Sequence, residues 1–268
     1  RKMDYRMSVS RGADPRGIDV ALLWDPKLFR RVDAHEIPHY GDLLSYPLRR
    51  DPRTKMERSG SGRNTLWVTL EQRHSGALLD VFVVHLPSRR GGVRTTSADR
   101  ERVTAKIYRV IQDLYEERPD ARVLIMGDFN DEPHNRALTT ALRTISPDTE
   151  GGEIRPRQFY NLAVPREREG KGSHYFGRQY WLPDQIIVSG SLLLDGASLR
   201  VSDPSMSIYE PGFLQERKSR PRRSFKGTHY TGGFSDHYPV YIDLIIDLTR
   251  ANSSDSFDTI PKTPDHNL

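Results

Sequence analysis

The sequence of 268 residues predicts a mixed α/β sandwich, in which sheets pack on each other and helices lie outside. Three observations lead to this prediction. Short apolar runs rich in β-branched residues recur along the chain between turn residues. One longer segment carries apolar residues at helical spacing. The chain has no internal repeats and no heptads, which argues against solenoids and coiled coils.

The first half of the chain holds three strand candidates. Residues 18–24 form an apolar run that stops at Asp25-Pro26. Residues 66–71 and 78–84 are two further runs, separated by a short segment that ends in Ser75-Gly76. We expect these two runs to pair as a β-hairpin.

A long helix is predicted over residues 98–117, and Pro119 follows its end. Its apolar face carries Val103, Ile107, Val110, Ile111 and Leu114. A short buried strand is predicted over 123–126, followed by a short helix over 136–143.

The second half predicts strands over 185–188 and 240–246. Between them lie the loop-rich stretches 149–172 and 202–233, and connections of this length are often functional. Residues 249–268 are polar and contain two prolines. We therefore expect one domain over residues 1–248 and a disordered tail over 249–268.

Composition excludes several classes of protein. The chain has no cysteine, so disulfide scaffolds, cysteine zinc sites, iron–sulfur clusters and thiol nucleophiles are ruled out. No apolar run is long enough to span a membrane. The first residues, Arg-Lys-Met-Asp-Tyr, resemble neither a signal peptide nor a natural initiator, so we expect the chain to begin inside a longer sequence.

The positive charge is concentrated in one segment. Residues 216–230 hold one acid and six cations, and so account for the whole net charge of +5; the cations are Arg217, Lys218, Arg220, Arg222, Arg223 and Lys226. A second arginine cluster consists of Arg89, Arg90, Arg94, Arg100 and Arg102. These clusters fit a rim that attracts phosphate, and equally a solvated surface that keeps the protein soluble.

Ionisable residues follow or precede four of the predicted strands. His85 follows the run 81–84, and Asp128 follows 123–126. Asp184 precedes 185–188, and Asp236-His237 precedes the last strand. Side chains at strand ends project into the crevice above a sheet, although each of these residues alone is equally typical of a turn or a surface position.

Taken in order, these segments are specific. Gly127-Asp128-Phe129-Asn130, then Asp184 before Ile186-Ile187-Val188-Ser189, then Ser235-Asp236-His237-Tyr238-Pro239 resemble the endonuclease/exonuclease/phosphatase superfamily. The segments that begin at Arg16 and at His85 resemble a bacterial branch of it, and the resemblance covers residues 16–247. It implies the DNase I-like four-layer sandwich, with two mostly antiparallel sheets packed face to face and helices outside.

The resemblance also implies a reaction: hydrolysis of a phosphoester by direct attack of water, with Mg²⁺ or Mn²⁺ as cofactor. Asp236 matches a metal ligand of the superfamily. His237 matches the group that activates or positions the water, and Asp184 the carboxylate that orients this histidine.

Other residues match more loosely. Asp128 corresponds to an acid that polarises water or assists the leaving oxygen, and it is also a candidate metal ligand. Asn130 would donate to a phosphoryl oxygen, and His85 would clamp phosphate or protonate the leaving group, supported by Asp19 or Arg16. Arg16 and Arg89 are expected to bind substrate.

One part of the superfamily pattern is not found. Its members carry an active-site Asn and a metal-binding Glu ahead of the segment that matches Arg16. None of the fifteen preceding residues fits, and Glu36 and Glu57 come too late in the order. We therefore expect an N-terminal portion to be absent, and expect this chain alone to bind metal weakly and to have poor activity.

A metal-dependent nuclease is the leading functional prediction. Aromatic residues that suit base stacking are interleaved with or flank the basic segment: Tyr209, Phe213, Phe225, Tyr230 and Phe234. The same features fit a phosphatase or phosphodiesterase acting on a small phosphorylated sugar, lipid head group or nucleotide. A non-catalytic phosphate-binding module is a further alternative. The bacterial branch favours an exported protein, and the sequence leaves the oligomeric state open.

Overall fold

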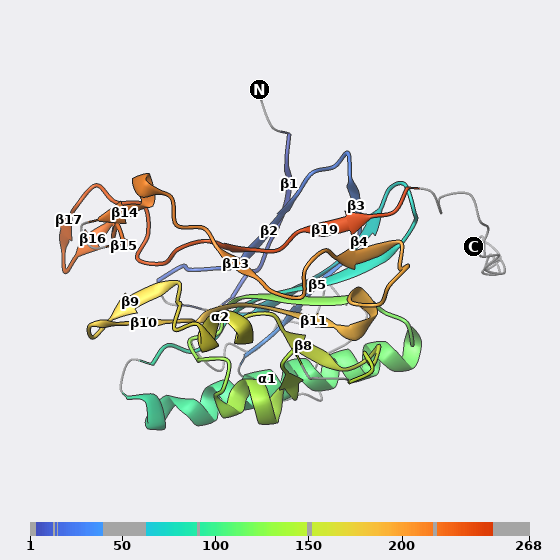
Figure 1. Ribbon diagram of the computed structural model, residues 1–268, viewed down its shortest axis with the longest axis horizontal. Coiled ribbons are helices and arrows are strands. Elements are labelled where there is room, and N and C mark those ends of the chain that lie inside the picture. Colours follow the sequence, from blue (N-terminus) through green and yellow to red (C-terminus); the bar gives the residue numbers. More distant parts are fainter. Residues whose placement is uncertain are drawn as a thin grey trace, which may run out of the picture.

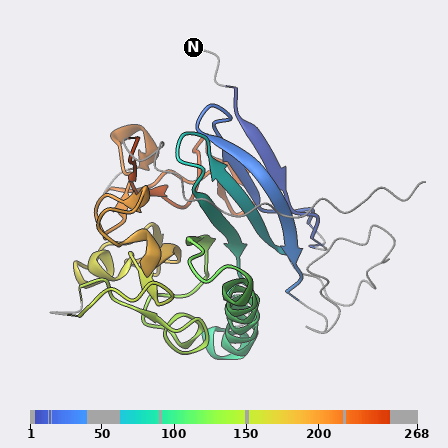
Figure 2. The same cartoon turned by 90° about the vertical axis from the view of Figure 1, so that its right-hand side faces the viewer.

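The computed structural model describes residues 4–12, 14, 16–39, 63–89, 92–148, 152–216 and 219–248. Its centre is a seven-stranded mixed sheet. One long helix, α1 (Val93–Glu117), lies along one face of this sheet, and short strand pairs lie over the other (Figure 1). Figure 2 looks along α1 and shows the strands rising beside it. The predicted mixed α/β sandwich is confirmed.

The central sheet has the strand order β3-β4-β5-β6-β11-β8-β7. Its strands are β3 (Phe29–Ile37), β4 (Thr65–Gln72), β5 (Leu78–His85), β6 (Val123–Asp128), β11 (Asp184–Ser189), β8 (Phe159–Asn161) and β7 (Thr144–Ile145). β4 and β5 form the predicted antiparallel hairpin. β5 runs parallel to β6 because α1 carries the chain back between them. β6 pairs with β11 in the antiparallel sense.

Both faces of the sheet are buried at β4, where every residue except Glu71 is buried. Leu66, Val68 and Leu70 point into one core. Trp67 points into the other, where its ring stacks on Phe82 at 5.2 Å between centroids. This alternation follows from the two-residue period of a strand.

The helix α1 closes the second core. Ile107, Ile111 and Leu114 are buried against the sheet. A short π-helix, η2 (Ala137–Ala141), packs beside α1 and occupies part of the predicted helix 136–143. The helix begins at Val93, five residues ahead of the predicted start, because Gly92 at φ 107° turns the chain there.

Three strand pairs cover the opposite face of the sheet. They are β1 (Arg6–Val9) with β2 (Ala21–Trp24), β12 (Leu199–Val201) with β19 (Leu244–Ile246), and β13 (Ser207–Ile208) with β18 (Val240–Tyr241). Leu22, Leu199 and Val201 pack into the same core as the inward residues of β4. The second layer of the sandwich therefore consists of short ladders in the described part of the chain.

Several predicted boundaries were wrong. The strand expected over 18–24 is ordered as a strand only from Ala21, and the run 240–246 divides into β18 and β19. The stretch 149–172 contains β8 and a short helix, α2 (Val164–Arg168), so it is more than a connection. The tail 249–268 lies outside the described residues.

Two small hairpin regions extend beyond the sheet. One is β9 (His174–Phe176) with β10 (Gln179–Trp181). The other we call the arm: residues 212–216 and 219–234, which contain η4 (Gly212–Leu214), β14 (Gln215–Glu216), β15 (Arg220–Pro221), β16 (Phe225–Lys226) and β17 (His229–Tyr230). Figure 1 shows the arm above the β9–β10 hairpin at the same end of the molecule. A single 3-10 turn, η3 (Gly190–Leu192), follows β11.

None of the helices in the described segments combines the length and the apolar character needed to cross a lipid bilayer.

Candidate active site

Three predicted site residues occupy one row across the central sheet. In the strand register His85 on β5 lies opposite Asp128 on β6, and Asp128 lies opposite Asp184 on β11. Residues opposite one another on neighbouring strands share a face, and adjacent strands are about 4.8 Å apart. The sheet itself therefore brings these three side chains together. The Nε2 of His85 lies 3.4 Å from Oδ2 of Asp128.

Gly127 allows the turn that presents Asp128. Its φ is +137°, and a Cβ at this position would lie 2.0 Å from the carbonyl oxygen of Val84. Asn130 follows with φ 50°, its backbone N–H donating to Oδ1 of Asp128 at 2.8 Å. The Asn130 side chain donates to the Leu86 carbonyl at 3.1 Å. The loop after β6 is thus folded back on the strand it leaves.

His237 joins this row from the far end of the chain. Its Nδ1 lies 2.6 Å from Oδ2 of Asp184, and the same oxygen accepts a 2.5 Å hydrogen bond from Ser173 Oγ. The backbone N–H of Tyr238 donates to the Ser173 carbonyl at 2.7 Å, which holds the segment against β9. The predicted pairing of Asp184 with His237 is present in the structure, and it leaves Nε2 of His237 available to substrate or water.

A second histidine, His174, stands beside the first. The ring centroids of His174 and His237 are 4.3 Å apart, and Nδ1 of His174 contacts the carbonyl oxygen of Asp236 at 2.8 Å. His174 and Ser173 were not predicted from the sequence. Both come from a short hairpin whose approach to residue 237 is a tertiary contact, and no local pattern marks them.

The charges of the site act strongly on His237. Burial alone would lower its pKa, but the hydrogen bond and charge of Asp184, together with Asp128 and Asp236, outweigh burial and raise the pKa to about 9. Burial and the charge of Asp184 raise the pKa of Asp128 to about 6. The site is therefore an anionic cluster that one imidazolium balances only in part.

His85 is held neutral. Burial, followed by the charge of Arg63, lowers its pKa to about 4. Arg63 is itself 7% exposed, and its Nε lies 3.3 Å from Oδ2 of Asp14. Arg16, a predicted substrate-binding residue, also pairs with Asp14 at 3.2 Å and has an exposed side chain. Asp19, by contrast, accepts a hydrogen bond from Gly12 N–H at 2.8 Å between β1 and β2.

Arg89 is the predicted substrate-binding residue whose position differs most from expectation. Its guanidinium donates to the Asn130 carbonyl at 2.7 Å, to Asp131 at 3.1 Å and to Asn135 at 2.7 Å. It also lies 4.6 Å from the ring centroid of Trp181. These contacts indicate that Arg89 braces the loop that carries Asn130. Buried Arg100 supports the same loop through a 2.9 Å ion pair with Asp131.

Two groups of side chains could hold a metal ion. Asp128, Asp184 and His237 form one, and His174, Asp236 and His237 form the other, with ligand atoms within 4.8 Å of one another in each. Carboxylate oxygens suit Mg²⁺ and Mn²⁺, and imidazole is compatible with Mn²⁺. Burial, followed by the charge of Asp184, raises the pKa of Asp128, so the protein alone stabilises its ionised form poorly. These residues therefore fit a divalent cation.

In the described segments no glutamate belongs to either group. Glu36, on β3, accepts hydrogen bonds from Arg11 N–H at 2.9 Å and from Asn64 Nδ2 at 2.8 Å. Glu57 and Arg90 lie outside the described residues, as do Arg217 and Lys218.

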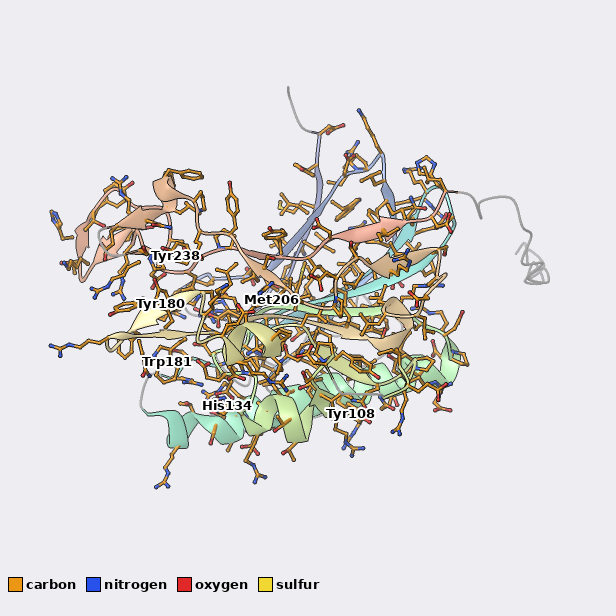
Figure 3. The ribbon with its side chains drawn as sticks, viewed as in Figure 1. Tyr108, His134, Tyr180, Trp181, Met206 and Tyr238 are labelled. Carbon is orange, nitrogen blue, oxygen red and sulfur yellow. The ribbon has the colours of Figure 1, made fainter. Side chains whose placement is uncertain are left out.

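A cavity of about 320 Å³ opens beside the row of His85, Asp128 and Asp184; it is lined by Asp184, Leu214, Phe234, Ser235, His237, Tyr238 and Pro239. Figure 3 labels Tyr238 beneath the arm, with Tyr180 and Trp181 of the β9–β10 hairpin below it. Tyr238 and Tyr180 both donate their hydroxyl groups to the Ser219 carbonyl, Tyr238 at 2.9 Å. The arm is thus fastened to the site by two tyrosines.

Similar solved structures share this fold. A humanized D. rerio TDP2 carrying 14 mutations is 17% identical, covers 90% of this chain and 76% of its own, and has a TM-score of 0.50. The mannosyl-6-phosphatase of Bacteroides thetaiotaomicron is 14% identical, with 90% and 77% covered and a TM-score of 0.51. An endonuclease/exonuclease/phosphatase family protein from the same species is 16% identical, with 91% and 76% covered and a TM-score of 0.51.

No curated protein sequence matches the chain. The family model described as endonuclease/exonuclease/phosphatase family matches residues 1–245. This is a family of metal-dependent phosphoesterases, which agrees with the row of acidic and histidine side chains at the sheet edge. With nearly its whole length matched, the chain belongs to the endonuclease/exonuclease/phosphatase family.

Proposed function

We propose that this chain is a divalent-metal-dependent phosphodiesterase that hydrolyses nucleic acid by direct attack of water. The observation that carries the proposal is the hydrogen-bonded pair Asp184–His237, set in the same sheet row as Asp128 and His85. This pair supplies a proton acceptor with a fixed orientation.

Asp128 and Asp236 are the carboxylates best placed to hold the cation, because each belongs to one of the two donor groups that share His237. A divalent cation bound there would neutralise the charge that develops on the phosphate in the transition state.

The two histidines have different roles: His237 accepts a proton, and His85 donates a hydrogen bond. With Nδ1 held by Asp184, His237 offers Nε2 to the attacking water. Asp128 and Asp236 help to raise the pKa of His237. Neutralising them lowers that pKa toward the range in which imidazole accepts a proton at neutral pH. His85, neutral because its pKa is about 4, can donate a hydrogen bond to a phosphoryl oxygen.

The arm supports nucleic acid as the substrate. Its basic residue Arg222 is joined to the cavity lining through its backbone, because its carbonyl accepts a hydrogen bond from the Phe234 N–H at 2.9 Å. A positive surface beside the reacting phosphate attracts a polyanion and releases its counterions. The modest size of the cavity favours one other candidate, a phosphatase acting on a small phosphorylated molecule.

The test is hydrolysis of single-stranded and duplex DNA, bis-p-nitrophenyl phosphate and p-nitrophenyl phosphate, with Mg²⁺ or Mn²⁺ and with chelator. We expect chelator-sensitive cleavage of the diesters, steeply inhibited by salt for DNA. His237→Ala should lower kcat by about 10²- to 10⁴-fold and leave DNA binding unchanged.

Faster turnover of p-nitrophenyl phosphate, with little salt dependence, would instead identify the small-substrate phosphatase. DNA binding without any turnover would identify a non-catalytic module.

A further inference from the structure

We infer that the cavity between the arm and His237 is a subsite for a nucleobase that neighbours the reacting phosphate. This inference rests on the proposed function for the position of the phosphate, since Asp184 and His237 form one wall of the cavity. Any group that fills the cavity is therefore a direct neighbour of the bond to be cleaved.

Another part of the cavity wall is apolar. Leu214, Phe234 and Pro239 supply a branched aliphatic chain, an aromatic ring and a pyrrolidine ring. The hydroxyl of Ser235 already accepts a hydrogen bond from the His237 N–H at 3.0 Å. A sugar would need several hydrogen-bond partners for its hydroxyl groups, and this wall offers few. A flat, aromatic group matches it better.

The Phe234 ring is exposed but its backbone is fixed. The side chain and backbone together are 62% exposed. Its N–H donates to the Arg222 carbonyl at 2.9 Å, and its carbonyl accepts from Ser224 Oγ at 2.8 Å. At Gly233 a Cβ would lie 2.0 Å from the Arg223 carbonyl oxygen, so only glycine permits this close strand crossing. The structure thus holds an aromatic ring toward solvent at the mouth of the cavity.

A second exposed ring supports the first. Phe213, 60% exposed, meets Phe234 edge to face with 6.0 Å between centroids. In this arrangement the two rings do not stack face to face, and base–aromatic stacking uses the face of a ring. Unlike the other exposed aromatic pair of the arm, Phe225 and Tyr230, this pair includes a ring that lines the cavity.

The arm is docked before any ligand arrives. Arg220 lies 4.1 Å from the ring centroid of Tyr175 and donates to its hydroxyl at 2.9 Å. Arg223 donates to the Tyr175 carbonyl at 2.7 Å. These contacts join the arm to β9, the strand that also carries His174. The cavity is therefore largely preformed, which lowers the entropic cost of binding.

Charge and shape together select the ligand. The arm is cationic, so the group that enters the cavity belongs to an anion. A cavity of about 320 Å³ is at the small end of ligand sites and accepts one planar group rather than a base pair. A base enters only when it is unpaired, so the inference predicts a preference for single strands, loops or frayed ends over intact duplex.

The test compares the binding of two end-labelled DNA pentamers by fluorescence anisotropy, in EDTA to prevent turnover. One pentamer is single-stranded oligothymidine, and the other carries an abasic residue at the position next to the central phosphate. We expect wild type to bind the intact pentamer more tightly. Phe234→Ala should weaken that binding about 5- to 150-fold and remove the preference over the abasic strand.

A matched control distinguishes base stacking on Phe234 from non-specific binding of DNA to the arm. Phe225 is 58% exposed on β16 and pairs with Tyr230 at 5.4 Å, but it does not line the cavity. Phe225→Ala should change binding less than twofold, and Phe234→Tyr should retain the preference for the intact strand. Because Phe225 and Phe234 are both exposed, we expect their variants to fold, and thermal unfolding measurements check this.

The inference is overturned if wild type binds the intact and abasic strands equally, or if Phe225→Ala loses as much affinity as Phe234→Ala. The test of the base subsite is independent of the test of the proposed hydrolysis. Discrimination by wild type in EDTA, lost in Phe234→Ala, supports the subsite even if Mg²⁺ and Mn²⁺ produce no cleavage. If thymidine monophosphate binds as tightly as the pentamer, the base subsite is supported, and its ligand is a free nucleotide rather than a DNA strand.

Discussion

At the scale of a single residue, Asp128 lowers the stability of the folded protein at neutral pH. Its carboxyl group is largely buried, and burial and the charge of Asp184 raise its pKa from 3.8 to about 6. An acid whose pKa is raised by folding favours the folded state below its unfolded pKa and loses that contribution as pH rises through the folded pKa. At neutral pH the ionised carboxylate therefore destabilises the metal-free protein.

Substitution of this residue should raise stability and abolish activity. At pH 7.5 in EDTA, Asp128→Asn should increase the free energy of unfolding by about 1–3 kcal/mol. At pH 4 both proteins carry a neutral side chain, so the gain should largely disappear. Urea denaturation at both pH values measures it, and an equal gain at both values would contradict the electrostatic explanation.

The orientation of His237 gives a second prediction. The hydrogen bond and charge of Asp184 are the largest contributions that raise the pKa of His237 to about 9. Asp184→Asn should therefore lower this pKa, and the imidazole should lose its proton at lower pH. NMR titration of the His237 ring in metal-free protein measures the change. The variant Asp195→Asn, on an exposed turn, should leave the titration unchanged.

At the scale of elements, the crossing of β5 and β6 depends on one glycine. A Cβ at Gly127 would overlap the Val84 carbonyl oxygen at 2.0 Å, and the backbone has φ +137°. Gly76 has φ +70° in the β4–β5 turn, but nothing lies within 4 Å of its Cβ position. Substitution of Gly76 therefore tests backbone strain alone, whereas substitution of Gly127 tests backbone strain together with steric overlap.

Alanine at the two positions should have unequal effects. Gly76→Ala should cost about 1–2 kcal/mol, the penalty for a left-handed residue. Gly127→Ala should cost about 4 kcal/mol or more and displace Asp128, because strand and loop must separate. Urea denaturation gives both values. Equal losses would mean that the contact with Val84 relaxes at no cost.

The same elements show what the sequence could predict. The β4–β5 hairpin was predictable because Leu66 to Leu70 and Leu79 to Val83 are mostly apolar, aromatic or β-branched, with a turn segment between them. The strand β3 was missed, since its sequence is rich in charged residues and shows no apolar run, and its pairing with β4 is what makes it a strand.

The candidate site divides in the same way. His85, Asp128 and Asp184 stand at strand ends, which local sequence reveals, and the chain order of the motifs added His237. Ser173 and Arg63 reach the site only through tertiary packing. A single sequence records no contact between such distant segments.

At the scale of the whole molecule, binding of a cation should stabilise the fold. A ligand that binds only the folded state at one hundred times its Kd adds about 2.7 kcal/mol. Mn²⁺ should therefore raise Tm at pH 7.5, and Asp236→Asn should reduce this increase. Differential scanning calorimetry with and without Mn²⁺ measures it. An increase of equal size in Asp236→Asn would place the cation elsewhere.

The long-range contact between Asp184 and His237 also has a consequence for the timing of protein synthesis. The two residues are 53 positions apart, and the Tyr238 backbone closes the contact by bonding to Ser173. A growing chain that has left the ribosome as far as Ser189 contains every strand of the central sheet, yet its Asp184 carboxylate still lacks His237. The pair forms only after the arm has been made and folded back. The protein therefore remains unable to use His237 until nearly all of its described core has been synthesised.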